Sequence, residues 1–224
     1  MLKHIPNFLT CCNLICGCLG VIGLLEGWNI PIAYFVWAAG IFDFFDGFAA
    51  RLLKISSPLG KELDSLADMV SFGMVPSLYM YVSLSLESPF SYIPYIAILI
   101  AVCSALRLAI FNLDESQSDS FKGLPTPANA FFITALPFLE SPILDFVFSP
   151  LVLSVIVVVF SLLLVSRIDL FALKFKNFGW ADNKTRFTFL GLAVLLIVAL
   201  KLAAFPFIIL SYIALSLGVR MFQK

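Results

Sequence analysis

The stretch DFFDGFAARLLKISSPLGKELDSLAD, residues 43–68, places four aspartates and an arginine within two apolar segments. The chain around it has 224 residues, of which 61% are hydrophobic and 12% are charged, whereas roughly 25% of the residues of a soluble domain are charged. The mean hydropathy is +1.03. These values predict an integral membrane protein. Because an ionised side chain at the centre of a bilayer costs roughly 3 kcal/mol, the aspartates indicate a functional site.

Apolar runs bounded by Gly, Pro and charged residues predict eight membrane-spanning helices. Since each span needs about 20 apolar residues, the chain has no room for a large soluble domain. We therefore expect one transmembrane domain over residues 1–224, an all-α polytopic bundle. Pro137 and Pro206 are expected to kink a helix or to begin one. The predicted helices cover residues 8–25, 31–54, 58–84, 92–111, 124–140, 146–165, 186–200 and 202–221.

The basic residues predict the orientation of these helices, because cytoplasmic loops carry an excess of Lys and Arg. Of the 14 Lys and Arg residues, only Lys201 falls on the opposite side, together with Glu26, Glu87 and Glu140. We expect a multi-pass protein of a cytoplasmic (inner) membrane, with both termini and the active site facing the cytoplasm. The segment 166–186 mixes bases with aromatic residues and is expected to lie among the lipid headgroups. The other thirteen bases are Lys3, Arg51, Lys54, Lys61, Arg107, Lys122, Arg167, Lys174, Lys176, Lys184, Arg186, Arg220 and Lys224.

The spacing of the aspartates predicts that they share one pocket. Asp43 and Asp46 are three residues apart and Asp64 and Asp68 are four apart, so in helices each pair projects from one face. A short turn at residues 56–58 joins the two helices, which should therefore run antiparallel and bring the two faces together near the cytoplasmic side.

Four neighbouring carboxylates need compensation by protonation, salt bridges or metal ions. Arg51 alone cannot balance four negative charges, and oxygen-only ligands suit Mg²⁺, Mn²⁺ or Ca²⁺. Two divalent cations would leave the site near neutral, and two-metal sites are a recurrent device for displacement at phosphorus. Gly47, Ala50 and Gly60 are small residues on the same faces, and they would leave room for a phosphate ligand. The zero net charge argues against a nucleic-acid partner, which needs a basic surface.

The whole stretch resembles the signature of the CDP-alcohol phosphatidyltransferase family at every fixed position. The matching pattern is Asp43-x-x-Asp46-Gly47-x-x-Ala50-Arg51, eight further residues, and Gly60-x-x-x-Asp64-x-x-x-Asp68. The resemblance implies six core transmembrane helices, to which this chain would add two, a polar cavity open to the cytoplasm, and a homodimer.

The resemblance also assigns roles to the residues of the signature. The four aspartates would be the catalytic residues and would hold two divalent metals, Mg²⁺ or Mn²⁺, that grip the diphosphate of CDP-diacylglycerol; Ca²⁺ is expected to occupy or to inhibit the site. Asp68 would also deprotonate the acceptor hydroxyl, and Gly47 and Arg51 would lie against the nucleotide diphosphate. A polar stripe at helical spacing near the N-terminus would border the cytidine, although hydrogen bonding between helices explains it equally well. The predicted CDP-lipid-binding residues are Asn7, Thr10, Asn13, Gly47, Ala50, Arg51 and Gly60.

The acceptor alcohol is indicated by stretches outside the signature. MVSFGMVPS (69–77), LRLAIFN (106–112), FKGLPTPANA (121–130) and IPNFLTCCNLICG (5–17) resemble the branch of the family that uses L-serine and yields phosphatidylserine and CMP. Met69 stands where relatives that use glycerol phosphate tend to have a lysine. The predicted acceptor-binding residues are Ser71, Arg107, Asn112 and Lys122.

Each of these assignments has an alternative. Arg107, close to the apolar interior, needs an anion, which could be a substrate carboxylate or a structural carboxylate, or its guanidinium could reach the membrane surface. The acceptor could be glycerol 3-phosphate, an inositol phosphate or choline. A different class of protein, an ion or proton transporter, also places acids in the membrane, but near the midplane and accessible from both sides.

Overall fold

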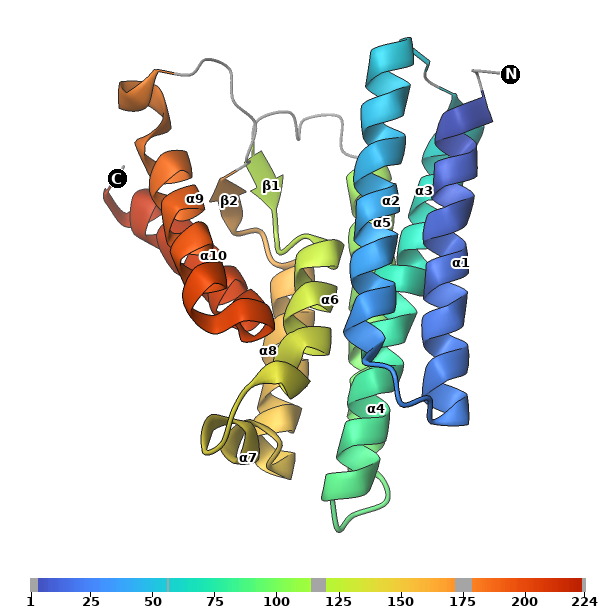
Figure 1. Cartoon of the computed structure of the whole chain (residues 1–224), viewed down its shortest axis with the longest axis vertical. Coiled ribbons are helices and arrows are strands. Elements are labelled where there is room, and N and C mark those ends of the chain that lie inside the picture. The colour runs from blue at the N-terminus through green and yellow to red at the C-terminus, as the bar shows by residue number, and fades with distance from the viewer. Residues whose placement is uncertain (1–3, 56, 114–119, 172–178, 223–224) are drawn as a thin grey trace.

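The computed structural model consists mainly of helices that run up and down one bundle (Figure 1). α1 (Ile5–Glu26) and α2 (Ile32–Leu53) pack side by side in opposite directions. Gly27 ends α1 in the left-handed conformation (φ 63°), and its N–H donates to the carbonyl of Gly23. The residues described are 4–55, 57–113, 120–171 and 179–222.

The next long helical segment, a rod made of three consecutive helical elements, carries the second half of the aspartate motif. α3 (Pro58–Asp68) begins with Ser57 as its N-cap, whose hydroxyl accepts a hydrogen bond from the N–H of Gly60 at 3.0 Å. The rod continues through a π-helical segment, η2 (Met69–Met74), into α4 (Val75–Glu87). Because a π-turn inserts an extra residue into the helical repeat, it resets which faces of the rod point to the neighbouring helices directly after Asp68.

The chain then returns along the bundle and crosses it several more times. η3 (Ile93–Ala97) leads into α5 (Ile98–Leu113), and the strand β1 (Ser120–Lys122) pairs antiparallel with β2 (Asp169–Phe171). The helical elements that follow β1 are α6 (Thr126–Ala135), η4 (Leu136–Phe138), α7 (Ile143–Val147), α8 (Pro150–Val165), α9 (Trp180–Leu200), η5 (Lys201–Ala203) and α10 (Ala204–Phe222).

Each of the eight predicted segments contains a helix, but not all of them are full-length spans. Within the described residues, five stretches are long and apolar enough to cross a membrane, and the last of them runs from α9 into α10. α6 and α8 have 10 and 16 residues, fewer than the roughly 20 of a typical span. The five stretches are Ile5–Glu26, Ile32–Leu53, Pro58–Glu87, Ile93–Leu113 and Asn183–Gly218.

Two smaller features bear on the predictions, and only the first agrees with them. Pro137 lies in the 3₁₀ turn η4, and Pro206 lies in the first turn of α10, as expected of a residue that cannot donate a helical hydrogen bond. The two-stranded sheet was not predicted, because strands of three residues carry no periodic signal. Within the segment 166–186, residues 172–178 lie outside the described part, as do Lys3, Lys174, Lys176 and Lys224.

Two groups of buried side chains hold the helices together. One group, which includes Val36, Ala39, Phe72 and Val75, lies between α2 and the η2–α4 part of the rod. The larger group joins α4, α5, α6 and α8 to α9 and α10, and includes Phe132 and Phe160, whose rings stack at 3.9 Å. The N-terminal helices therefore meet the C-terminal ones through α4, α5 and α6.

The close approach of α1 to η2 depends on Gly17. A Cβ atom at this position would lie 2.9 Å from the Cα of Ser71, so Gly17→Ala must push two backbones apart. We expect a loss of about 1–3 kcal/mol of stability, seen as a lower midpoint of thermal unfolding in detergent. Gly191→Ala on α9 is the matched control, because a Cβ there meets nothing within 4 Å. Equal midpoints for the two variants would contradict the close packing.

Candidate active site

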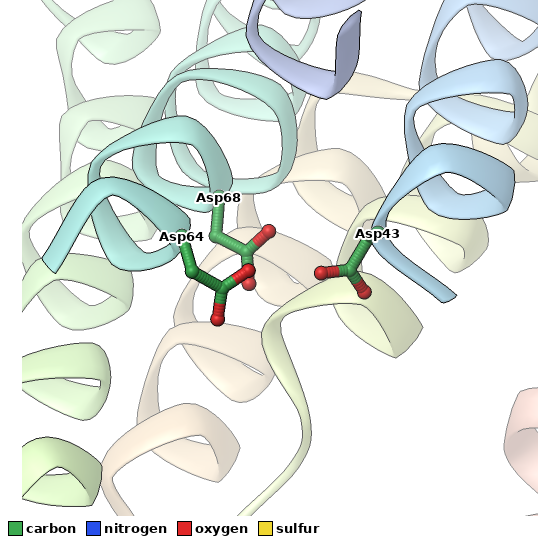
Figure 2. Close-up of side chains that lie close together, drawn as sticks. All are labelled: Asp43, Asp64 and Asp68. Carbon is green, nitrogen blue, oxygen red and sulfur yellow. The ribbon is translucent and has the colours of Figure 1, made fainter. Parts of the chain in front are cut away.

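Three aspartates from two helices point toward one another (Figure 2). Asp43 lies on α2, while Asp64 and Asp68 lie one turn apart on α3. One carboxylate oxygen of each residue lies within 4.8 Å of the other two. At a rise of 1.5 Å per residue, Asp68 is about 15 Å from the start of α3 and Asp43 about 15 Å from the end of α2. The acids therefore converge well below the ends of the two helices, where Asp68 is buried and Asp43 and Asp64 are partly buried.

The fourth aspartate lies beside this triad but does not belong to it. Asp46 is one turn along α2 and is 6% exposed. Its carboxylate accepts a hydrogen bond from the hydroxyl of Thr10 on α1 at 2.7 Å. Four carboxylates were predicted to share one site. In the structure Asp43, Asp64 and Asp68 come together, and Asp46 is directed toward α1.

The triad is suited to a divalent cation. Its ligands are all carboxylate oxygens, the type preferred by Mg²⁺, Mn²⁺ and Ca²⁺. Asp64 Oδ1 is buried and has no hydrogen-bond partner among the described residues. A buried carboxylate oxygen without a partner is costly, and coordination to a cation would remove that cost. These side chains could therefore hold a metal ion.

Asn13 and Ser71 support the triad from α1 and η2. The side-chain amide of Asn13 donates to Asp68 Oδ1 at 3.1 Å, and the hydroxyl of Ser71 donates to the backbone carbonyl of Asn13 at 3.0 Å. Both residues are completely buried. Asn13 was predicted to border the CDP-lipid and contacts Asp68, the candidate for the general base. Ser71 was predicted to bind the acceptor and lies where α1 contacts η2.

A pocket of about 260 Å³ opens beside Asp46 and Asp64. Five of the predicted CDP-lipid-binding residues line it, and a Cβ on one of them, Gly60, would lie 3.2 Å from Asn7 Oδ1. Arg51 is exposed and does not line the pocket, although its guanidinium lies near Gly47. The five predicted residues in the lining are Asn7, Thr10, Gly47, Ala50 and Gly60.

A second pocket, of about 510 Å³, lies between α5, α8 and the two strands. It brings together Arg107 and Lys122, two of the predicted acceptor-binding residues, with Arg167 and Asp169. Arg107 is 8% exposed, and its Nη1 donates to the hydroxyl of Thr126 at 3.0 Å.

Sequence reasoning did not predict that Arg167 and Asp169 line this pocket. The one available signal was a base directly after an apolar run, and it was used only to orient the chain.

Asn112 lies outside this pocket. Its side-chain amide donates to the hydroxyl of Ser65 at 2.8 Å, and its backbone carbonyl accepts from Lys61 Nζ at 2.6 Å. The residue therefore ties the end of α5 to α3. The structure supports a bracing role here more directly than contact with an acceptor.

The helical bundle and its buried carboxylates define an integral membrane protein with a candidate metal site between two helices. The chain belongs to the CDP-alcohol phosphatidyltransferase family, whose model matches residues 3–167. It is therefore an enzyme, and the alternative of an ion or proton transporter is set aside.

Several relatives carry one name, CDP-diacylglycerol--serine O-phosphatidyltransferase. The protein of Bacillus subtilis is 39% identical over 147 residues, which cover 64% of this chain and 80% of that protein. The protein of Methanocaldococcus jannaschii is 33% identical over 164 residues, covering 73% of this chain and 72% of that protein. The protein of Mycobacterium tuberculosis is 36% identical over 136 residues, covering 58% of this chain and 47% of that protein.

Proposed function

We propose that the chain transfers the phosphatidyl group of CDP-diacylglycerol to the hydroxyl of L-serine, giving phosphatidylserine and CMP in phospholipid biosynthesis. The observation that carries this proposal is the similarity, at 33–39% identity, to relatives named for that reaction. The carboxylate triad beside one pocket, with a basic second pocket near it, supports the same chemistry.

The pocket beside Asp46 and Asp64 is the proposed place of the CDP diphosphate. Small residues on α2 and at the start of α3 leave room there, and Asn7 and Thr10 offer polar atoms from α1. Asp43, Asp64 and Asp68, with Asp46 beside them, would hold two divalent cations, Mg²⁺ or Mn²⁺. When bound, such ions offset the charge of the diphosphate and stabilise the leaving oxygen.

Asp68 is the proposed general base. Asn13 donates to one of its oxygens, which fixes the carboxylate and leaves the other oxygen able to accept the proton of the serine hydroxyl. The serine oxygen then forms a bond to the phosphorus of the phosphatidyl group. The bond from that phosphorus to the oxygen of CMP breaks, so CMP leaves with the electron pair and the proton remains on Asp68.

Arg107 is the proposed partner of the serine carboxylate. Thr126 holds one nitrogen of its guanidinium, while Nε is buried without a hydrogen-bond partner among the described residues. Arg107 is near enough to Asp68 to interact with it electrostatically, so a serine whose carboxylate binds Arg107 would lie near the proposed base. Lys122 and Arg167 add positive charge to the same pocket.

The orientation and assembly remain predictions. The end of α2, the start of α3 and the end of α5 lie at the same end of the bundle (Figure 1), and the described bases Arg51, Lys54 and Lys61 belong to this region. The excess of bases supports a cytoplasmic position for this end. We also propose a homodimer and a single transmembrane domain over residues 1–224, on the resemblance to the family.

The reaction is tested by CMP release from purified protein in detergent. CDP-diacylglycerol and Mn²⁺ or Mg²⁺ are supplied with L-serine, glycerol 3-phosphate, inositol phosphate or choline in parallel. We expect metal-dependent release of CMP and formation of phosphatidylserine with L-serine alone. Release with another alcohol would keep the reaction type and overturn the acceptor, and no release with any alcohol would contradict the proposed activity.

Arg107→Gln tests the assignment of the carboxylate partner. We expect the KM for L-serine to rise at least about tenfold, equivalent to roughly 1.4 kcal/mol, because a charge-assisted hydrogen bond is lost. Ethanolamine is L-serine without the carboxylate, so the preference of the enzyme for serine over ethanolamine should fall by a similar factor. An unchanged preference would show that Arg107 does not bind the carboxylate.

A further inference from the structure

The two C-terminal helices lie beyond the part of the chain that the family model matches. That model ends at Arg167, whereas α9 begins at Trp180 and α10 ends at Phe222. α10 packs against α6 and against the strand β2, and Figure 1 shows it beside both. We call the second pocket, which contains Arg107, the acceptor pocket. The two C-terminal helices therefore touch β2, which forms one wall of this pocket.

Tyr212 makes the most specific of these contacts. It lies on α10, is 7% exposed, and donates its hydroxyl to the carbonyl of Phe171 at 2.9 Å. The rings of Tyr212 and Phe171 also meet edge to face, with centroids 5.0 Å apart. Phe189 on α9 completes the group, with its ring centroid 5.7 Å from that of Tyr212 and 5.8 Å from that of Phe171. Both C-terminal helices thus hold the last residue of β2.

The strand β2 in turn positions the wall of the pocket. Lys122 on β1 is paired with Asp169 on β2, and both residues line the pocket together with Arg167. The N–H of Gly123 donates to the carbonyl of Ile168 at 2.9 Å. Every residue of this wall therefore belongs to β1, β2 or the residues next to them.

A ribbon of two three-residue strands is too short to keep its own shape, since even isolated hairpins are marginal in water. It needs an anchor outside itself. One end is fixed to α8, because the N–H of Leu124 donates to the carbonyl of Leu163 at 2.9 Å. Gly123 (φ 76°) allows this approach, as a Cβ there would lie 2.6 Å from the carbonyl oxygen of Leu164. The other end, at Phe171, is fixed by Tyr212.

We propose that Tyr212 is a positioning residue for the acceptor pocket, and that α9 and α10 serve to hold β2 so that Lys122, Arg167 and Asp169 keep their places around Arg107. The inference rests on the proposed function for the identity of the acceptor. The hydroxyl of Tyr212 acts through the carbonyl of Phe171 and also interacts electrostatically with Arg107, without contact with the substrate. Loss of its hydroxyl should therefore change affinity for the acceptor while leaving the site of CDP-diacylglycerol, which is built on α1, α2 and α3, unchanged.

The test is Tyr212→Phe in the full-length protein, which keeps the ring and removes only the hydroxyl. We expect the KM for L-serine to rise about three- to tenfold, the range produced by the loss of one hydrogen bond. The KM for CDP-diacylglycerol and kcat should stay within about twofold of the wild type. Tyr92→Phe is the matched control, because Tyr92 is 69% exposed and lies in the connection between α4 and η3 at the other end of the bundle.

Hydrogen exchange gives a readout that does not depend on activity. The amides of β1 and β2, which pair from Lys122 and Asp169 to Ser120 and Phe171, should exchange faster in Tyr212→Phe and at the wild-type rate in Tyr92→Phe. An unchanged KM for serine, or equal increases for both substrates, would overturn the positioning role. If the wild type uses a different alcohol, the proposed function fails, and the role of Tyr212 is then tested by the KM for that alcohol. If the wild type uses no alcohol, unchanged amide exchange in Tyr212→Phe is sufficient to overturn the positioning role.

Discussion

Asp68→Asn is expected to lower the rate of CMP release by about 10²–10⁴-fold, the contribution usual for a positioned general base. Asparagine has nearly the same size and shape as aspartate, so the packing of α3 against α1 should survive. It cannot accept the proton of the acceptor hydroxyl, and it removes one negative charge from the triad. The measurement is single-turnover release of CMP at saturating L-serine and Mn²⁺.

Asp145→Asn is the matched control for this experiment. Asp145 is an exposed carboxylate on α7 that accepts a hydrogen bond from Ser141, and α7 lies at the end of the bundle away from β1 and β2 (Figure 1). This variant should release CMP at the wild-type rate. A rate for Asp68→Asn within about fivefold of that control would remove Asp68 from the role of base.

The aspartate triad could be predicted because its geometry is mostly local. Asp64 and Asp68 are one helical turn apart whatever surrounds them, and a short turn between two helices leaves little choice but an antiparallel pair. The orientation of Asp46 does not follow from the local sequence. Three residues along a helix leave a side chain about 60° away from the first, and the hydroxyl of Thr10 on α1 determines where that carboxylate points.

The second pocket could be predicted only in part, because its wall is assembled from distant segments. Arg107 stood out as a base in an apolar run, and Lys122 stood out in a stretch that resembles the family. Arg167 and Asp169 reach the pocket through the pairing of β1 with β2, and a strand of three residues gives no pattern to read. The π-turn after Asp68 is likewise invisible in the sequence, and it contains Ser71, which faces α1.

Asp43→Asn is expected to weaken metal binding more than Asp46→Asn does. The oxygens of Asp43 lie within the triad, whereas one oxygen of Asp46 is already engaged by Thr10. Loss of even an indirect partner of a metal ligand typically costs about 10–100-fold in affinity, so loss of a triad ligand should raise the Mn²⁺ concentration for half-maximal activity at least that much. EDTA should abolish CMP release in the wild type, and added Mg²⁺ or Mn²⁺ should restore it.

Direct binding of Mn²⁺, followed by electron paramagnetic resonance or by calorimetry, separates this effect from a loss of catalysis. We expect two ions per wild-type chain, a large loss of affinity in Asp43→Asn, and a smaller one in Asp46→Asn, with Asp145→Asn unchanged. Equal losses in the two α2 variants would mean that all four carboxylates coordinate the ions equally once substrate and metal are present. Wild-type affinity for Mn²⁺ in Asp43→Asn would mean that no cation holds the triad together. Protonation of the carboxylates would then have to offset their mutual repulsion.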